Sequence, residues 1–187
     1  MVNKLSFPAE RRLMHKRTVR CFGYERHDGY YDIEGHLTDS KTYRLEDFDR
    51  GPMEPGEPVH EMFLRLTVDG DLTIKASEAA IVWSPYNICK AVEVNFDKLA
   101  GEVIGPGFKK RVKQKLGGTQ GCTHLVELLG PIATTAFQTI YPKNIKQEEA
   151  GTKETKPRLL NTCHAWAEDS EMIRSRHPKY FRGIKTK

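Results

Sequence analysis

Two cysteines stand where helices are expected to begin. Cys122 opens a long segment of apolar periodicity, and Cys89 lies near the start of a shorter one. At the N-terminal end of a helix, the dipole and the unpaired backbone N–H groups favour a thiolate, the form of cysteine that attacks electrophiles and ligates metals. If both helices pack on one sheet, the two thiols meet at one point. We therefore predict a metal-binding or sulfur-carrying site formed by Cys89 and Cys122.

The same two cysteines also fit an apolar interior. Each belongs to the apolar stripe of its own segment, and unpaired cysteines are commonly buried as small hydrophobic residues. The four cysteines of the chain also lack the Cys-x-x-Cys spacing of a zinc knuckle. Two thiolates that share one ion, each bonded at about 2.3 Å, must lie about 4 Å apart. The distance between the sulfur atoms of Cys89 and Cys122 therefore separates the two interpretations.

A second group of chemically useful residues lies on one predicted strand. Asp32, Glu34 and His36 alternate along the chain, so all three project from one face. Carboxylates beside an imidazole suit a divalent metal or acid–base chemistry. The plain alternative is a solvent-exposed sheet face, where such alternation is normal.

Further histidines flank these elements and extend the candidate sites. His60 begins a second predicted hairpin, and a catalytic pair of Cys122 with His36 or His60 as the base is consistent with the pattern. His124 shares a site with Cys122 only if the helix begins at or after Cys122, because residues two apart on a helix diverge. The predicted catalytic residues are Cys122, His36 and Glu34. The predicted ligands, for zinc or another transition metal, are Cys89, Cys122, His36, His60 and Asp32.

Strands are expected in the first half of the chain. The segments that favour strands are residues 18–24, 30–38, 59–68 and 72–76. Asp28-Gly29, between the first two, is one of the strongest short hairpin signals. A two-residue turn at this point places Cys21 opposite His36 and Glu25 opposite Asp32.

Helices are expected in the second half. Apolar residues recur at helical spacing after Cys89, Phe108 and Cys122, and Pro131 is expected to kink or break the last of these segments. Strands followed by helices predict an α+β fold, in which an antiparallel sheet of N-terminal hairpins is covered on one face by the C-terminal helices.

The domain organisation follows from composition. We expect a single α+β domain over residues 1–141 and a polar, aperiodic linker or loop over 142–157. Residues 158–187 are expected to form a helical extension, with a short helix around 163–176, that packs on the domain.

Charge and targeting signals restrict the class of partner. The net charge is +5, but the main basic cluster, residues 109–115, is interleaved with apolar residues at helical spacing, which is typical of a solvated helix face. We expect a small molecule or a metal as partner, not nucleic acid, and leave an anionic ligand and a homo-oligomer open. No apolar run approaches the roughly 18–20 residues of a membrane span. Four cysteines without a signal-peptide core indicate reduced thiols and a cytoplasmic protein.

Several stretches resemble the signatures of a bacterial family known only as a domain of unknown function. These stretches are DIEGHLTD (32–39), IGPGF (104–108), GCTHLVELL (121–129), ATTAFQ (133–138) and NTCHA (161–165). The resemblance runs from about residue 11 to the C-terminus. It implies a cytoplasmic protein of proteobacterial type and brings no established activity.

The order of elements is also similar to that of iron–sulfur-cluster scaffold proteins and their SufE-type relatives. In that group, cysteines at helix starts receive sulfur or hold zinc or a cluster, and Cys89 and Cys122 correspond to two of three such cysteines. The third, expected on a loop between strands, is absent, because no cysteine lies between Cys21 and Cys89. This is a similarity of architecture, and architecture alone does not fix function.

Three functions are consistent with these patterns. The first is a metal-binding or sulfur-carrier role at the helix-start cysteines. The second is an enzyme that acts on a small acyl or aromatic substrate through Cys122 or through the face of Asp32, Glu34 and His36. The third is a non-catalytic accessory protein whose polar sheet face docks a partner.

Overall fold

A computed structural model describes residues 6–150, 156–157 and 159–183. The chain forms two units, Met1–Tyr141 and Pro142–Lys187. None of the helices in the described part of the chain has the length and apolar character that crossing a membrane requires.

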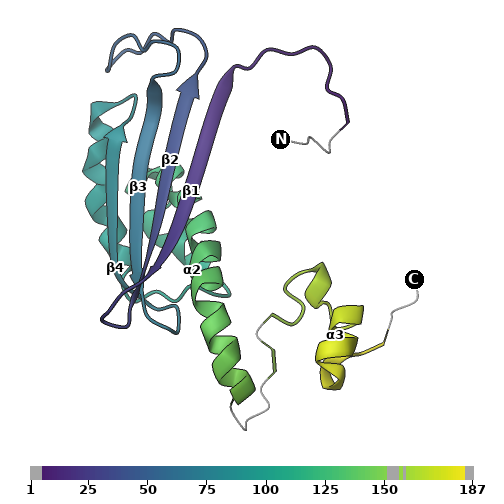
Figure 1. The fold of residues 1–187 in the computed structure, drawn as a ribbon. Helices are drawn as coiled ribbons and strands as arrows, with labels where there is room; N and C mark the ends of the chain where they lie inside the picture. The colour runs from purple at the N-terminus through teal and green to yellow at the C-terminus, as the bar shows by residue number, and fades with distance from the viewer. Residues whose placement is uncertain (1–5, 151–155, 158, 184–187) are drawn as a thin grey trace. The chain divides into compact units, whose positions relative to one another are not determined.

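The first unit is built on a four-stranded antiparallel sheet (Figure 1). Its strands lie side by side in chain order: β1 (His15–Glu25), β2 (Tyr31–Lys41), β3 (Pro58–Val68) and β4 (Ile74–Trp83). The helices that follow pack on the sheet, which confirms the predicted α+β fold.

The turn between β1 and β2 differs from the predicted one by one residue. The Arg26 N–H donates to the carbonyl of Tyr30, the Gly29 N–H donates to the carbonyl of Arg26, and Gly29 has a φ of 86°. This is a three-residue loop that ends in a left-handed glycine, which is a common alternative to the two-residue turn.

The longer loop moves the register of the whole hairpin by one position. Cys21 therefore lies opposite Gly35, and Arg20 lies opposite His36. The predicted pairing of Cys21 with His36 is wrong, as is that of Glu25, which lies opposite Tyr31. A one-residue slip exchanges the partners of every side chain along the ladder.

Helical segments follow the sheet: η1 (Asn87–Leu99), α1 (Phe108–Leu116), η2 (Gly118–Gln120) and α2 (Thr123–Ala150), of which the residues up to Tyr141 belong to the first unit. The segment after Cys89 is a 3₁₀ helix that packs against β4. Pro131 lies on the exposed side of α2 and does not end the helix, which continues to Ala150. Residues 142–150, predicted as part of a linker, are thus helical. Residues 151–155 and 158 lie outside the described residues.

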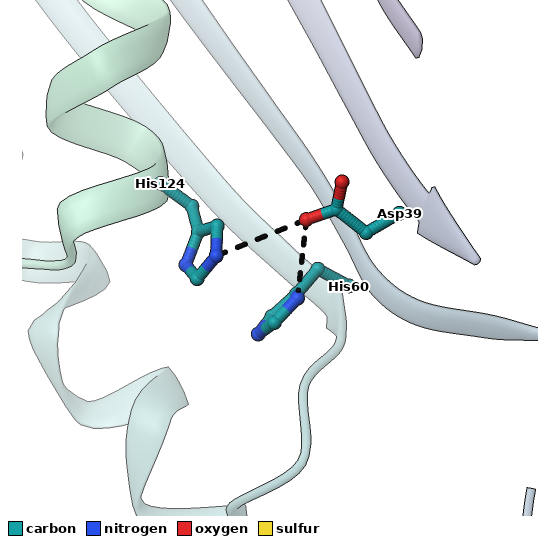
Figure 2. Close-up of side chains that lie close together, drawn as sticks. All are labelled: Asp39, His60 and His124. Carbon is teal, nitrogen blue, oxygen red and sulfur yellow. Dashed lines mark ion pairs between the residues drawn. The ribbon is translucent and has the colours of Figure 1, made fainter. Parts of the chain in front are cut away.

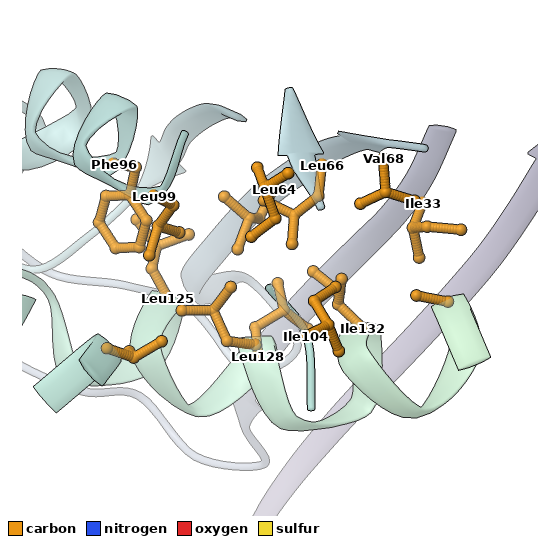
Figure 3. Packing of buried hydrophobic residues seen from close by; sticks show 14 of the residues in the cluster. Ile33, Leu64, Leu66, Val68, Phe96, Leu99, Ile104, Leu125, Leu128 and Ile132 are labelled. Carbon is orange, nitrogen blue, oxygen red and sulfur yellow. The ribbon is translucent and has the colours of Figure 1, made fainter. Parts of the chain in front are cut away.

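The core fills the space between the sheet and the helices. Alternate positions of β2 are buried, as a strand with one covered face requires. Figure 3 shows residues of α2 and η1 facing residues of the strands across this space. The fully buried residues include Ile33, Leu64, Leu66, Val68, Phe96, Leu99, Leu125 and Ile132.

Two glycines let α2 approach the sheet closely. A Cβ atom on Gly35 would lie 2.6 Å from Cδ1 of Ile132, and one on Gly23 would lie 1.9 Å from Oγ1 of Thr139. Backbone of β1 and β2 therefore touches the helix at positions where any side chain would hold it away.

In the second unit, the described residues form η3 (His164–Trp166), α3 (Glu171–Arg176) and η4 (Pro178–Tyr180). The helix predicted around 163–176 is thus divided into two short helices. The hydroxyl of Ser170 accepts a hydrogen bond from the Ile173 N–H and caps α3, and Ile173 is fully buried.

The close approach at Gly35 predicts a loss of stability on substitution. Gly35→Ala is expected to lower the free energy of unfolding by about 1–3 kcal/mol, because the added methyl group pushes Ile132 out of its packed position. Urea denaturation measures the change. Gly105→Ala is the matched control, since Gly105 has open space around it and a negative φ. Equal effects of the two substitutions would contradict this account.

Candidate metal centre

Asp39 carries a buried charge on the covered face of the sheet. It lies near the end of β2, in phase with Ile33 and Leu37, and the residue is 1% exposed. A register shift between Asp39 and Ser40 marks a bulge against β3 at this point. A carboxylate removed from water must be paired and hydrogen-bonded, so its neighbours decide what the site can do.

Arg17 supplies the first partner of Asp39 from the neighbouring strand. The two residues lie opposite each other in the β1–β2 ladder. Arg17 Nε donates to Oδ1 and Arg17 Nη2 donates to Oδ2, both at 2.7 Å, in a bidentate pair. Burial raises the pKa of the Asp39 carboxyl, but the Arg17 guanidinium outweighs burial and holds that pKa below its usual value. Asp39 is therefore a carboxylate at neutral pH.

His15 of β1 places its Nε2 3.3 Å from Oδ1 of Asp39, and two histidines from distant parts of the chain converge on the other oxygen, Oδ2. His60 lies opposite Asp39 in the β2–β3 ladder, and its Nδ1 is 3.3 Å from Oδ2. His124, in the first turn of α2, places Nε2 3.8 Å from that same oxygen. The two rings lie 3.8 Å apart between centroids, and both point toward Asp39 (Figure 2). One ligand atom from each of the three residues lies within 4.8 Å of the other two.

Both imidazoles are held in the neutral form. Burial, together with the neighbouring His124, lowers the pKa of His60 to about 4, against the opposing attraction of Asp39. Burial and the positive charge of Arg17 likewise lower the pKa of His124. At pH 7 each ring therefore has an unprotonated nitrogen, which is the state of histidine that binds metals.

The spacing of these atoms suits one ion. Two ligands bonded at about 2.0–2.1 Å in a tetrahedral arrangement lie roughly 3.4 Å apart. The separations of 3.3 Å and 3.8 Å from Asp39 Oδ2 need only small movements to reach that value. Two imidazoles and one carboxylate form a donor set that zinc and other divalent transition metals accept. The cluster of Asp39, His60 and His124 could therefore hold a metal ion.

Cys122 lies beside this cluster. Its Sγ is 3.8 Å from Nδ1 of His124 and 3.8 Å from Sδ of Met62. The carbonyl of Cys122 accepts the first helical hydrogen bond, from Val126, and α2 begins at Thr123. The condition for Cys122 and His124 to share a site is therefore met. The thiol faces the ring nitrogen that does not point toward Asp39.

The structure places the other predicted strand residues on the opposite face. His36 Nε2 is 3.0 Å from Oε1 of Glu61, and its ring stacks on Phe63 with centroids 4.2 Å apart. Asp32 accepts a hydrogen bond from Thr67, and Glu34 lies 3.5 Å from Arg65. Since side chains alternate along β2, these three residues point away from the face that carries Asp39. They are not brought together with His60.

Cys89 lies on η1 and is partly buried against the core. Among the described residues it belongs to no group of three clustered metal-ligating side chains. Cys21 is also packed against the core, and burial raises the pKa of its thiol. A shared ion between Cys89 and Cys122 stays a prediction.

Asp39 and His124 were missed as metal ligands in the sequence analysis, although one signal was available. Asp39 continues the phase of Ile33 and Leu37, so a charged side chain stands where the strand pattern requires a buried apolar one. An ionisable residue in a core position indicates a buried polar cluster or a site.

The neutral histidines predict acid sensitivity of the metal-free protein. The pKa of His60 is about 4 in the folded protein against an ordinary value of 6.5, so only the unfolded chain gains this proton as the pH falls between these values. The associated loss of stability is roughly 3 kcal/mol, complete near pH 4 and absent above pH 7. Urea denaturation in the presence of a chelator, at pH 7 and pH 4.5, measures the loss. His60→Asn is expected to reduce this loss of stability. If the pH dependence of stability is the same in this variant, protonation of His60 is not its cause.

Comparisons with known proteins assign the chain to a family. No curated protein matches the sequence, and no solved structure matches it. The resemblance to iron–sulfur scaffold proteins therefore gains no support. A family model described as "Protein of unknown function (DUF2889)" matches residues 15–138, a span that contains all four strands and the whole Asp39 cluster. The chain belongs to the DUF2889 family of proteins of unknown function.

Proposed function

We propose that this protein is a metal-binding protein whose ion, zinc or another divalent transition metal, is held by Asp39, His60 and His124. The observation that carries the proposal is the convergence of two neutral imidazole nitrogens on one oxygen of a buried carboxylate. Neutral histidines bind a metal without first releasing a proton, so the site is prepared for the ion at neutral pH.

The surrounding groups support this assignment. Arg17 keeps Asp39 ionised and fixes its orientation by donating to both oxygens, and Oδ2 also faces His60 and His124. With Nε2 of His124 on the ion, its Nδ1–H points to the sulfur of Cys122, which then acts as the outer partner that metal-bound histidines commonly have.

Three protein ligands leave a coordination position for water or a substrate, as in catalytic zinc sites. An ion bound in this way supplies a polarising charge or an activated water.

Metal titration of purified, chelator-treated protein tests the proposal. Zn²⁺ is expected to bind with a stoichiometry of one, and the double substitution His60→Ala/His124→Ala is expected to weaken binding by about 100-fold or more, since even outer-shell partners of a metal are worth about 10–100-fold. Isothermal titration calorimetry measures the affinity, and circular dichroism checks that the variant is folded.

Two control variants separate this site from the sites predicted from the sequence. His36→Ala changes a histidine on the other sheet face and is expected to leave Zn²⁺ affinity unchanged. Cys89→Ser is likewise expected to leave the affinity for Zn²⁺ unchanged. Binding that survives the double histidine substitution and disappears in Cys89→Ser or His36→Ala would overturn the proposed ligand set.

A second candidate function is that of a thiol-dependent enzyme. It is favoured because a thiol, an imidazole and a carboxylate follow one another in space. Cys122 Sγ, the His124 ring and Asp39 Oδ2 follow one another with separations of 3.8 Å and 3.8 Å. In the metal-free protein, Nδ1 of His124 can accept the proton of the thiol while Nε2–H points to Asp39. This is the arrangement of a nucleophile, a base and an orienting acid. Its substrate class would be a small acyl compound.

The two functions require different tautomers of His124, and alkylation kinetics distinguish them. Iodoacetamide reacts when the thiol proton passes to His124 and the sulfur displaces iodide. In metal-free protein, His124→Ala is expected to slow alkylation of Cys122 about 10-fold or more. Bound Zn²⁺ is expected to slow it as well, because Nδ1 then carries a proton. Mass spectrometry of the Cys122 peptide measures the alkylation rate. An alkylation rate that His124→Ala leaves unchanged would exclude the thiol enzyme.

A further inference from the structure

The second face of the sheet presents aromatic side chains to solvent. This outer face is made of the side chains that alternate with the buried ones. Phe22 and Tyr24 of β1 and Phe63 of β3 lie on it, with exposed fractions of 50%, 48% and 41%. Large aromatic side chains gathered at one place on a surface indicate a binding site more often than chance exposure does.

These aromatic residues surround a hollow of about 340 Å³. Such a volume lies within the range of small-molecule sites, which is about 300–1,000 Å³. Phe22, Tyr24 and Phe63 line the hollow together with polar side chains from all four strands, including Arg20, His36 and Glu78. The hollow shares no lining residue with the Asp39 cluster on the covered face.

The charges around the hollow are almost all neutralised within the protein. Arg65 forms ion pairs with Glu34 and Glu78, and His36 is paired with Glu61. Arg20 differs: its backbone pairs with His36 in the β1–β2 ladder, but among the described residues its guanidinium has no hydrogen-bond or ion-pair partner. The hollow therefore combines one unpaired guanidinium with three aromatic rings, and these groups suit a ligand that has both a negative charge and an aromatic ring.

We infer that the hollow binds a small planar aromatic carboxylate. The ring stacks among Phe22, Tyr24 and Phe63, where offset or edge-to-face contacts are favourable. The carboxylate accepts hydrogen bonds from Arg20, whose fork of N–H donors matches two oxygens. The stacked pair of His36 and Phe63, with ring planes 3° apart, gives the hollow one rigid, flat wall.

Calorimetric titration of the full chain with 2-naphthoate tests the inference. Binding with a stoichiometry of one is expected, and Arg20→Gln is expected to weaken it at least about 10-fold, the effect of losing a charge-assisted hydrogen bond. Phe22→Ala is expected to weaken it by a similar factor. The neutral alcohol 2-naphthylmethanol is expected to bind more weakly than 2-naphthoate to the unaltered chain, and Arg20→Gln is expected to remove that difference.

Control measurements distinguish binding of 2-naphthoate in this hollow from an effect of the metal site or of dimer formation. The His60→Ala/His124→Ala double variant is expected to bind 2-naphthoate as the unaltered chain does, so failure of the metal site leaves this result intact. No binding of 2-naphthoate, or equal binding by the Arg20→Gln variant, overturns the inference. A concentration-dependent dimer that Phe22→Ala abolishes, seen by light scattering, also overturns it, because a second copy would then be the occupant of the face.

Discussion

The buried carboxylate of Asp39 is the constraint on which the functional end of the sheet depends. A carboxylate on a residue that is 1% exposed cannot be left without partners. Arg17 reaches it from β1, His60 from β3 and His124 from α2, so one side chain on β2 connects three other elements. Arg17 bonds both oxygens of this carboxylate, and His60 and His124 each place a ring nitrogen within 3.8 Å of Oδ2, so two metal-binding nitrogens gather at one oxygen.

The two-residue period of the strands divides the chemistry of the molecule between two environments. On the covered face of β2, Asp39 lies among neutral imidazoles away from water. On the outer face, His36 and Glu34 lie among aromatic rings and paired charges in contact with solvent. The candidate metal centre and the aromatic hollow thus lie on opposite sides of one strand, and they share no side chain.

Helix α2 completes the metal centre because it can approach the sheet closely. Gly23 and Gly35 leave no side chain between the helix and the backbone of β1 and β2. Since the helix lies this close, its first turn brings His124 to Asp39, and Cys122 follows at the N-terminal end. The helix-start position of Cys122 places its thiol 3.8 Å from Nδ1 of His124, so the thiol belongs to the same cluster of groups.

The sequence by itself determined the α+β class, the alternation that separates the two faces of β2, and a helix that begins next to Cys122. These properties are local, since they follow from residue types at a period of two or 3.6. Only the tertiary structure decided the register of the first hairpin, where a left-handed Gly29 lengthened the turn, and the meeting of Asp39, His60 and His124. The Asp-Gly signal fits both a two-residue and a three-residue turn. Contacts between residues so far apart in the chain depend also on the depth at which a helix packs, which no short-range pattern encodes.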